Sequence, residues 1–109
     1  MGVTDDPKDP RLHHGVDEVG GSEQHDTYLV LSEAERKKGF VRPYRDAYRH
    51  LVCGRITTMG RALAETYARD PSFYGATFCA TCGGHFAVGA EGEFTWYEMD
   101  GTDGPKVGT

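Results

Sequence analysis

Cysteine is scarce in this chain, and long apolar runs are missing from it. The 109 residues include three cysteines and one tryptophan. Three cysteines cannot all form pairs, which argues against a disulfide-stapled secreted domain and favours a reducing compartment. No apolar run approaches the roughly 20 residues that a membrane-spanning helix needs, and the acidic, polar N-terminus is unlike a secretory signal peptide. We therefore predict a soluble protein of the cytoplasm.

Charge is unevenly distributed along the chain, whose formal net charge is −5. Residues 1–31 hold seven acidic and two basic side chains, whereas residues 32–53 hold three acidic and six basic ones. The C-terminal part is acidic again. An overall negative charge opposes non-specific attraction to a polyanion, so a nucleic-acid partner would have to use the basic middle segment.

All three cysteines lie in two short ligand pairs, which we call the first knuckle (residues 50–54) and the second knuckle (residues 79–83). Their sequences are His50-Leu51-Val52-Cys53-Gly54 and Cys79-Ala80-Thr81-Cys82-Gly83. A structural zinc ion takes four such nitrogen and sulfur ligands. The glycine after each second ligand lets the backbone curl back, so that amide hydrogens can point at metal-bound sulfur. The spacing predicts a structural Zn²⁺ site formed by His50, Cys53, Cys79 and Cys82.

One further histidine competes for a place in this site. His85 follows Cys82 at the same three-residue spacing, which gives five candidates for four positions. Two symmetric knuckles close a tetrahedron easily, and this favours His50. His85 is then the alternative ligand, or a neighbour that hydrogen-bonds a ligand.

Three segments are expected from composition: a flexible, disordered acidic arm over residues 1–26, a zinc-stabilised domain over residues 27–100, and a polar tail over residues 101–109. The arm has too few large apolar side chains to offset the entropy lost on ordering. We predict an α+β fold for the domain, similar to a zinc ribbon or treble clef, with one central helix at about 57–70 and a C-terminal β-hairpin.

Local patterns predict the elements of this domain. Ser32 and Glu35 match a capping box for a short helix that Gly39 ends. In the longer helix, Thr57 or Thr58 could cap the start, and Asp70-Pro71 ends it. Its apolar face has helical spacing and comprises Met59, Ala62, Leu63, Thr66 and Tyr67. Residues 85–88 and 94–98 alternate like strands, and the intervening glycines predict that they form the hairpin.

Arginines and tyrosines interleave around the first knuckle. Such a composition suits phosphate and base contacts, and also a solvated face with packed tyrosines. The candidate nucleic-acid or partner-binding residues are Arg42, Tyr44, Arg45, Tyr48, Arg49 and Arg55.

Several longer runs in the chain carry a resemblance. They are Thr57-Thr58-Met59, Phe73-Tyr74-Gly75, the segment from Leu63 to Pro71, Phe94-Thr95-Trp96 and the two knuckles. From about Val41 onward, these runs resemble a group of small proteins encoded by bacteriophages, especially phages of actinobacteria. The resemblance implies a phage context, hence a host-cell cytoplasm, and a zinc site. It implies no activity and no catalytic residues.

The favoured function is a non-enzymatic, zinc-stabilised binding module whose partner is a host or phage protein; no membrane or small-molecule substrate is expected. The alternative is a zinc-finger protein that binds nucleic acid. A zinc hydrolase or nuclease would need an open coordination position and a general base, for which Glu65 or His85 could serve. A redox pair of Cys79 and Cys82 is disfavoured, because no thioredoxin-like βαβ pattern surrounds it.

Overall fold

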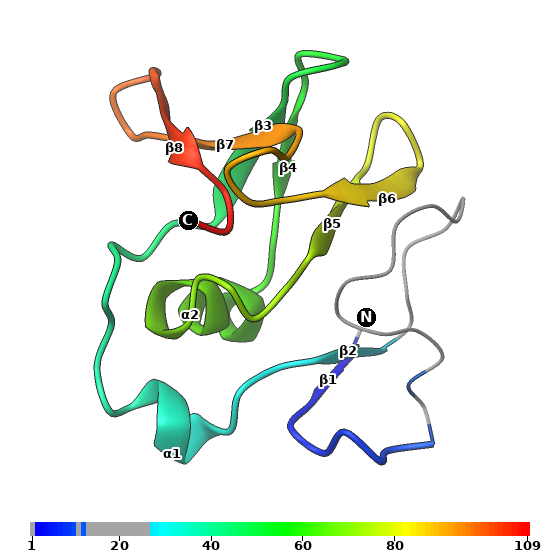
Figure 1. The fold of residues 1–109 in the computed structure, drawn as a ribbon, viewed down its shortest axis with the longest axis vertical. Coiled ribbons are helices and arrows are strands. Elements are labelled where there is room, and N and C mark those ends of the chain that lie inside the picture. Colours follow the sequence, from blue (N-terminus) through cyan, green and yellow to red (C-terminus); the bar gives the residue numbers. More distant parts are fainter. Residues whose placement is uncertain (1, 11, 13–26) are drawn as a thin grey trace.

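Short strands and two short helices alternate in the computed structural model, which describes residues 2–10, 12 and 27–109 (Figure 1). Both element types contribute to one core, so the predicted α+β class is confirmed. In chain order the elements are β1 (Gly2–Thr4), β2 (Thr27–Leu29), α1 (Glu33–Arg36), β3 (Ala47–His50), β4 (Ile56–Thr58), α2 (Arg61–Arg69), β5 (Ala76–Cys79), β6 (Gly84–Ala87), β7 (Phe94–Tyr97) and β8 (Asp103–Lys106).

The largest sheet has four antiparallel strands in the order β4-β3-β7-β8, and β5 with β6 forms a separate antiparallel hairpin. The predicted strands at 85–88 and 94–98 exist, but the prediction that they pair with each other is wrong. β6 pairs with β5, and β7 pairs with β3, for example Tyr48 with Trp96. β7 therefore joins a strand more than 40 residues upstream, and the C-terminal hairpin consists of β7 and β8 instead.

Helix α2 is shorter than predicted and does not lie at the centre of the fold. Residues 56–58 belong to β4, so the helix begins after Gly60, which caps it without a side-chain hydrogen bond. Thr57 does not cap the helix; its hydroxyl accepts a hydrogen bond of 3.2 Å from the Ala80 N–H group. The end at Asp70 before Pro71 is as predicted, and Leu63, Thr66 and Tyr67 face the core. In Figure 1, α2 covers one side of the strands rather than passing between them.

The short helix α1 has the predicted N-cap. The Ser32 hydroxyl accepts a hydrogen bond of 3.1 Å from the Glu35 N–H group, and Gly39 follows the helix at a φ of 113°. Arg36 of α1 then forms an ion pair of 2.6 Å with Glu65 of α2, where both side chains are largely buried. This contact fixes the two helices to one another.

Residues 101–109, expected to be a polar tail, complete the large sheet. β8 pairs with β7, and Val107 is fully buried with its N–H group donating to the Phe94 carbonyl at 3.0 Å. Backbone pairing with β7 and the burial of Val107 in the core together hold this polar segment in place. Of the predicted arm, residues 2–4 form β1, parallel to β2; residues 1, 11 and 13–26 lie outside the described part.

The core is rich in aromatic rings and extends from α2 to the two knuckles. Trp96 meets Tyr48 and Tyr67 edge-on, with ring centroids 6.4 and 5.5 Å apart. Phe94 and Cys79 are completely buried at the knuckle end of this cluster. Among the described residues, no helix is long and apolar enough to cross a membrane.

Candidate metal centre

The structure brings the two knuckles together so that their four predicted ligand atoms lie within 4.8 Å of one another. The sulfur atoms of Cys53 and Cys79 are 3.6 Å apart, and Cys82 Sγ is 3.4 Å from His50 Nδ1. A tetrahedral zinc ion bound at about 2.0–2.3 Å sets its ligand atoms roughly 3.5–3.8 Å apart. The cluster therefore has the size for one metal ion. The sulfur separation is far beyond the roughly 2.05 Å of a disulfide, and all three cysteines are free thiols.

Both knuckles are closed by the same backbone hydrogen bond and the same glycine conformation. Each begins at the end of a strand, β3 or β5, and its glycine N–H group donates to the carbonyl of the first ligand residue. These hydrogen bonds measure 2.7 Å from Gly54 to His50 and 2.8 Å from Gly83 to Cys79. The φ angles of the two glycines, 75° and 69°, lie in the left-handed region that other residues adopt only at a cost. The predicted role of the two glycines is confirmed.

An amide hydrogen also points at a ligand sulfur, as the knuckle pattern predicts. The Cys82 N–H group lies 3.4 Å from Cys79 Sγ. Such a contact stabilises a thiolate, because it places partial positive charge beside the sulfur. The Cys82 N–H group thus directs partial positive charge at the sulfur of Cys79, the buried ligand residue of the second knuckle.

His50 is held in position on both faces and at both ring nitrogens. Its ring stacks between Phe86 and Phe94, with centroids 4.7 and 4.6 Å away, and it is 1% exposed. Nδ1 faces Cys82, while Nε2 lies 2.8 Å from a carboxylate oxygen of Glu93. A carboxylate that accepts a hydrogen bond from the outer nitrogen of a ligand histidine fixes the tautomer that offers the inner nitrogen to the metal.

Glu93 was not among the residues identified from the sequence, where it belonged to a predicted hairpin linker. It directly precedes β7, and Phe94 pairs with His50 in the sheet, so the Glu93 side chain lies beside the imidazole. Its carbonyl also accepts a hydrogen bond of 2.8 Å from the Leu51 N–H group. Only the pairing of β3 with β7, which no local pattern encodes, could have identified it.

The metal-free thiols differ in acidity. A backbone hydrogen bond from Arg55, helped by contacts with the other ligands, lowers the pKa of Cys53 to about 7. Burial and hydrogen bonds with Cys53 and Cys79 raise the pKa of Cys82 to about 11. Metal binding requires thiolates, so it must displace the Cys82 proton at neutral pH. As the pH falls through 7, the Cys53 proton competes as well, and metal affinity decreases.

His85, the alternative ligand, lies outside this cluster. It sits in β6 opposite Phe78 of β5 and is buried. Its Nε2 atom lies 3.0 Å from the hydroxyl of Tyr28 in β2. His85 therefore connects the second knuckle's hairpin to the N-terminal strands.

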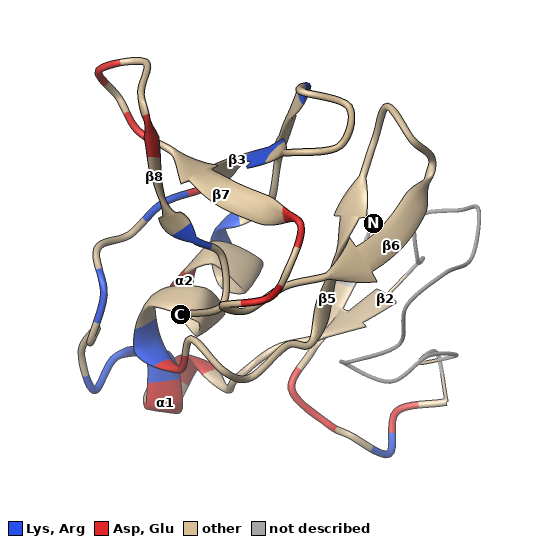
Figure 2. Ribbon diagram, turned by 45° about the horizontal axis from the view of Figure 1, so that its top comes forward, with Lys and Arg blue, Asp and Glu red and all other residues tan. Residues whose placement is uncertain are grey.

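The four arginines and two tyrosines around the first knuckle do not form one free basic surface. Figure 2 shows Lys and Arg (blue) distributed over several segments, with Asp and Glu (red) on β8 and next to β7. Tyr48 is a core residue, and its hydroxyl donates to the Phe78 carbonyl at 2.6 Å. Arg45 pairs with Glu98 at 2.7 Å and Arg49 with Asp103 at 2.8 Å. The exposed members of the set are Arg42, Tyr44 and Arg55.

No family model, curated protein or solved structure matches this chain. The first ligand of each pair ends a strand, His50 in β3 and Cys79 in β5, and the second ligand lies in the turn that follows. None of the four residues comes from a helix.

Substituting Glu93 by glutamine is expected to lower zinc affinity by about 10- to 100-fold, because the His50 imidazole loses its carboxylate partner. Competition with a chromophoric zinc chelator measures this change. Glu91→Gln is the matched control, since Glu91 is exposed in the same loop, and it should leave the affinity unaltered. Equal affinities for the two variants would remove Glu93 from the metal centre.

Proposed function

We propose that this protein is a non-enzymatic, zinc-stabilised binding module of zinc-ribbon type that binds a host or phage protein. The observation that carries the proposal is the convergence of His50, Cys53, Cys79 and Cys82 at tetrahedral spacing. Three thiolates with one imidazole suit zinc better than hard cations such as Mg²⁺ or Ca²⁺. Phage origin is a proposal from the resemblance of the sequence runs.

A structural role follows from the number of ligands. Four protein ligands complete a tetrahedron, so no coordination position remains for a water molecule that the metal could activate. Neither proposed general base is suited to serve such a water. Burial raises the pKa of Glu65, but hydrogen bonds from Arg36 and Arg61 outweigh it and lower that pKa; His85 faces Tyr28.

A protein partner is supported by the surface of the first knuckle. The hairpin of β3 and β4 projects from the body of the fold (Figure 1). It exposes three apolar side chains, Leu51 at 46%, Val52 at 72% and Ile56 at 39%. Clustered apolar side chains are typical of protein interfaces. By contrast, two of the four arginines nearby are already neutralised by acidic residues, which weakens the case for nucleic acid.

Val52→Asp is expected to abolish capture of the partner, because it places a charge in the apolar surface of the first knuckle. Tagged protein is purified from host cells after nuclease treatment, and the proteins that copurify are quantified by mass spectrometry. Met99→Asp is the matched control, since Met99 is a fully exposed apolar residue in the turn between β7 and β8.

We expect at least one protein to be enriched with the wild type and with Met99→Asp, and to be lost with Val52→Asp. Equal enrichment with Val52→Asp would exclude the first knuckle as the interface. Binding of labelled DNA or RNA, with a slope of log affinity on log salt of about −3, would support the nucleic-acid alternative instead.

A further inference from the structure

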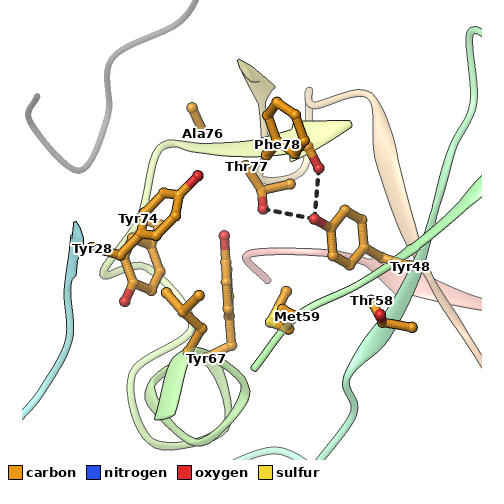
Figure 3. Close-up of a pocket in the computed structure, with 10 residues that line it drawn as sticks. Tyr28, Tyr48, Thr58, Met59, Tyr67, Tyr74, Ala76, Thr77 and Phe78 are labelled. Atoms are coloured by element: carbon orange, nitrogen blue, oxygen red, sulfur yellow. Dashed lines mark hydrogen bonds between the residues drawn. The ribbon is translucent and has the colours of Figure 1, made fainter. Parts of the chain in front are cut away.

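A small cavity lies in the aromatic core, away from the metal centre. It has a volume of about 40 Å³ and lies where α2, β5 and the segment from β4 to Met59 meet (Figure 3). About 10–15 Å³ holds one water molecule, so this cavity has room for a group of roughly three or four non-hydrogen atoms. The lining residues are Tyr28, Tyr48, Thr58, Met59, Leu63, Tyr67, Tyr74, Ala76, Thr77 and Phe78.

Three of the four tyrosine hydroxyls around the cavity have a partner in the protein. The Tyr48 hydroxyl donates to the Phe78 carbonyl, the Tyr74 hydroxyl donates to the Leu29 carbonyl at 2.5 Å, and the Tyr28 hydroxyl meets His85. These three hydroxyls are therefore already engaged with the protein, and their contacts stabilise the walls of the cavity.

Tyr67 is the exception. Its side chain is 3% exposed, and its hydroxyl has no hydrogen-bond partner of adequate geometry among the described residues. The nearby Thr77 hydroxyl donates to Tyr48 at 3.4 Å. Figure 3 shows the Tyr67 oxygen directed into the space between Tyr74, Thr77 and Tyr48. A buried polar group left without a partner is costly, and a native protein normally satisfies it with a bound molecule.

The cavity favours an uncharged occupant, because no Asp, Glu, Lys, Arg or His side chain among the described residues lines it and an unpaired charge would be expensive there. Burial raises the pKa of Tyr67 well above its ordinary value, and the contact with Thr77 opposes this only in part. Tyr67 therefore stays protonated at neutral pH, and its O–H group can donate a hydrogen bond to an acceptor.

We propose that this cavity is a binding site for a small uncharged molecule, or the end of one, whose carbonyl or hydroxyl oxygen accepts a hydrogen bond from Tyr67. The apolar part of the molecule packs against Leu63, Met59 and the tyrosine rings. Access is through the rim, where Thr58 is exposed and Met59 and Phe78 are half-buried, whereas Tyr67, Tyr74 and Ala76 form the buried floor.

The test uses the zinc-loaded, full-length protein and two probes of similar size, acetone and dichloromethane, of which only acetone carries a carbonyl oxygen. NMR titrations follow the Met59 methyl group and the ring resonances of Tyr67 and Tyr74. The ceiling on binding energy per ligand atom limits probes of this size to dissociation constants weaker than about 10⁻⁵ M, and millimolar values are expected. Acetone gains a hydrogen bond from Tyr67 but loses its hydrogen bonds with water, so the quantity compared between variants is the ratio of the affinities for acetone and dichloromethane.

Tyr67→Phe keeps the ring and removes the hydroxyl, so it should weaken acetone about tenfold relative to dichloromethane, which still binds. Tyr44→Phe is the matched control: Tyr44 is exposed and does not line the cavity, and the affinity ratio should not change. Ala76→Val adds two methyl groups at the floor of the cavity and should abolish binding of both probes.

Two results would overturn the proposal. If neither probe causes saturable shifts at Met59 or Tyr67, the cavity holds water only. If the affinity ratio of acetone to dichloromethane is the same in Tyr67→Phe as in the wild type, the Tyr67 hydroxyl does not select the occupant.

Discussion

Replacing Cys79 by serine is expected to eliminate stoichiometric zinc and to unfold the domain that the knuckles hold together. Cys79 is completely buried, and its Sγ atom lies 3.6 Å from that of Cys53. A serine hydroxyl stays protonated at neutral pH and is a poor zinc ligand. Structural zinc contributes about 10–16 kcal/mol of apparent folding free energy, whereas a whole domain is stable by only about 5–15 kcal/mol. Loss of the ion therefore removes most of the free energy of unfolding of the domain.

Elemental analysis and amide NMR spectra measure the two consequences. We expect about one zinc per chain in the wild type and about one-tenth of that or less in Cys79→Ser, whose spectrum should lose its dispersion. Ala80→Ser introduces the same hydroxyl one position away, at an exposed site of the same knuckle, and should resemble the wild type. A wild-type protein that lacks metal and stays folded in excess chelator would contradict the zinc site as a whole.

The four residues that are placed to hold a metal ion could be predicted from the sequence, because the information is local. In each knuckle, two potential ligands three residues apart and a following glycine favour one tight turn. Gly54 and Gly83 both have the positive φ that their position requires. Two such turns with complementary ligands suit one metal ion, and the structure places their four ligand atoms within 4.8 Å of one another.

The pairing of the strands could not be predicted in this way. Residues 85–88 and 94–98 look like a hairpin because they are adjacent and separated by glycines. β6 instead pairs with β5 across the tight turn of the second knuckle, and β7 is taken by β3. This choice depends on packing between Trp96, Tyr48 and Tyr67, which lie far apart in the chain. Glu93, the carboxylate partner of His50, can be identified only when that pairing is known.

The start of α2 and the C-terminal segment illustrate the same limit. Thr57 has the chemistry of a helix cap, but pairing with Tyr48 places it in β4. Residues 101–109 are polar on average, yet β8 and the buried Val107 complete the sheet. In both cases tertiary contacts outweigh a local preference that is worth about 1 kcal/mol.

Comparing the two buried histidines is the clearest way to distinguish a metal ligand from a packing residue. His50 and His85 are similarly buried, at 1% and 2% exposure, and each lies near a phenylalanine ring. They differ in their contacts. His50 presents Nδ1 to Cys82 and Nε2 to Glu93, whereas His85 meets the Tyr28 hydroxyl.

His50→Ala is expected to lower zinc affinity by at least about 100-fold, since one of four ligands is lost and Glu93 is left without its partner. His85→Ala should retain about one zinc per chain and lose about 1–3 kcal/mol of unfolding free energy, the typical cost of a buried hydrogen bond broken on one side. Chelator competition measures the first quantity, and denaturant unfolding of the zinc-loaded protein measures the second. If His85→Ala lost zinc while His50→Ala kept it, the two histidines would have to exchange roles, and the two-knuckle site would be wrong.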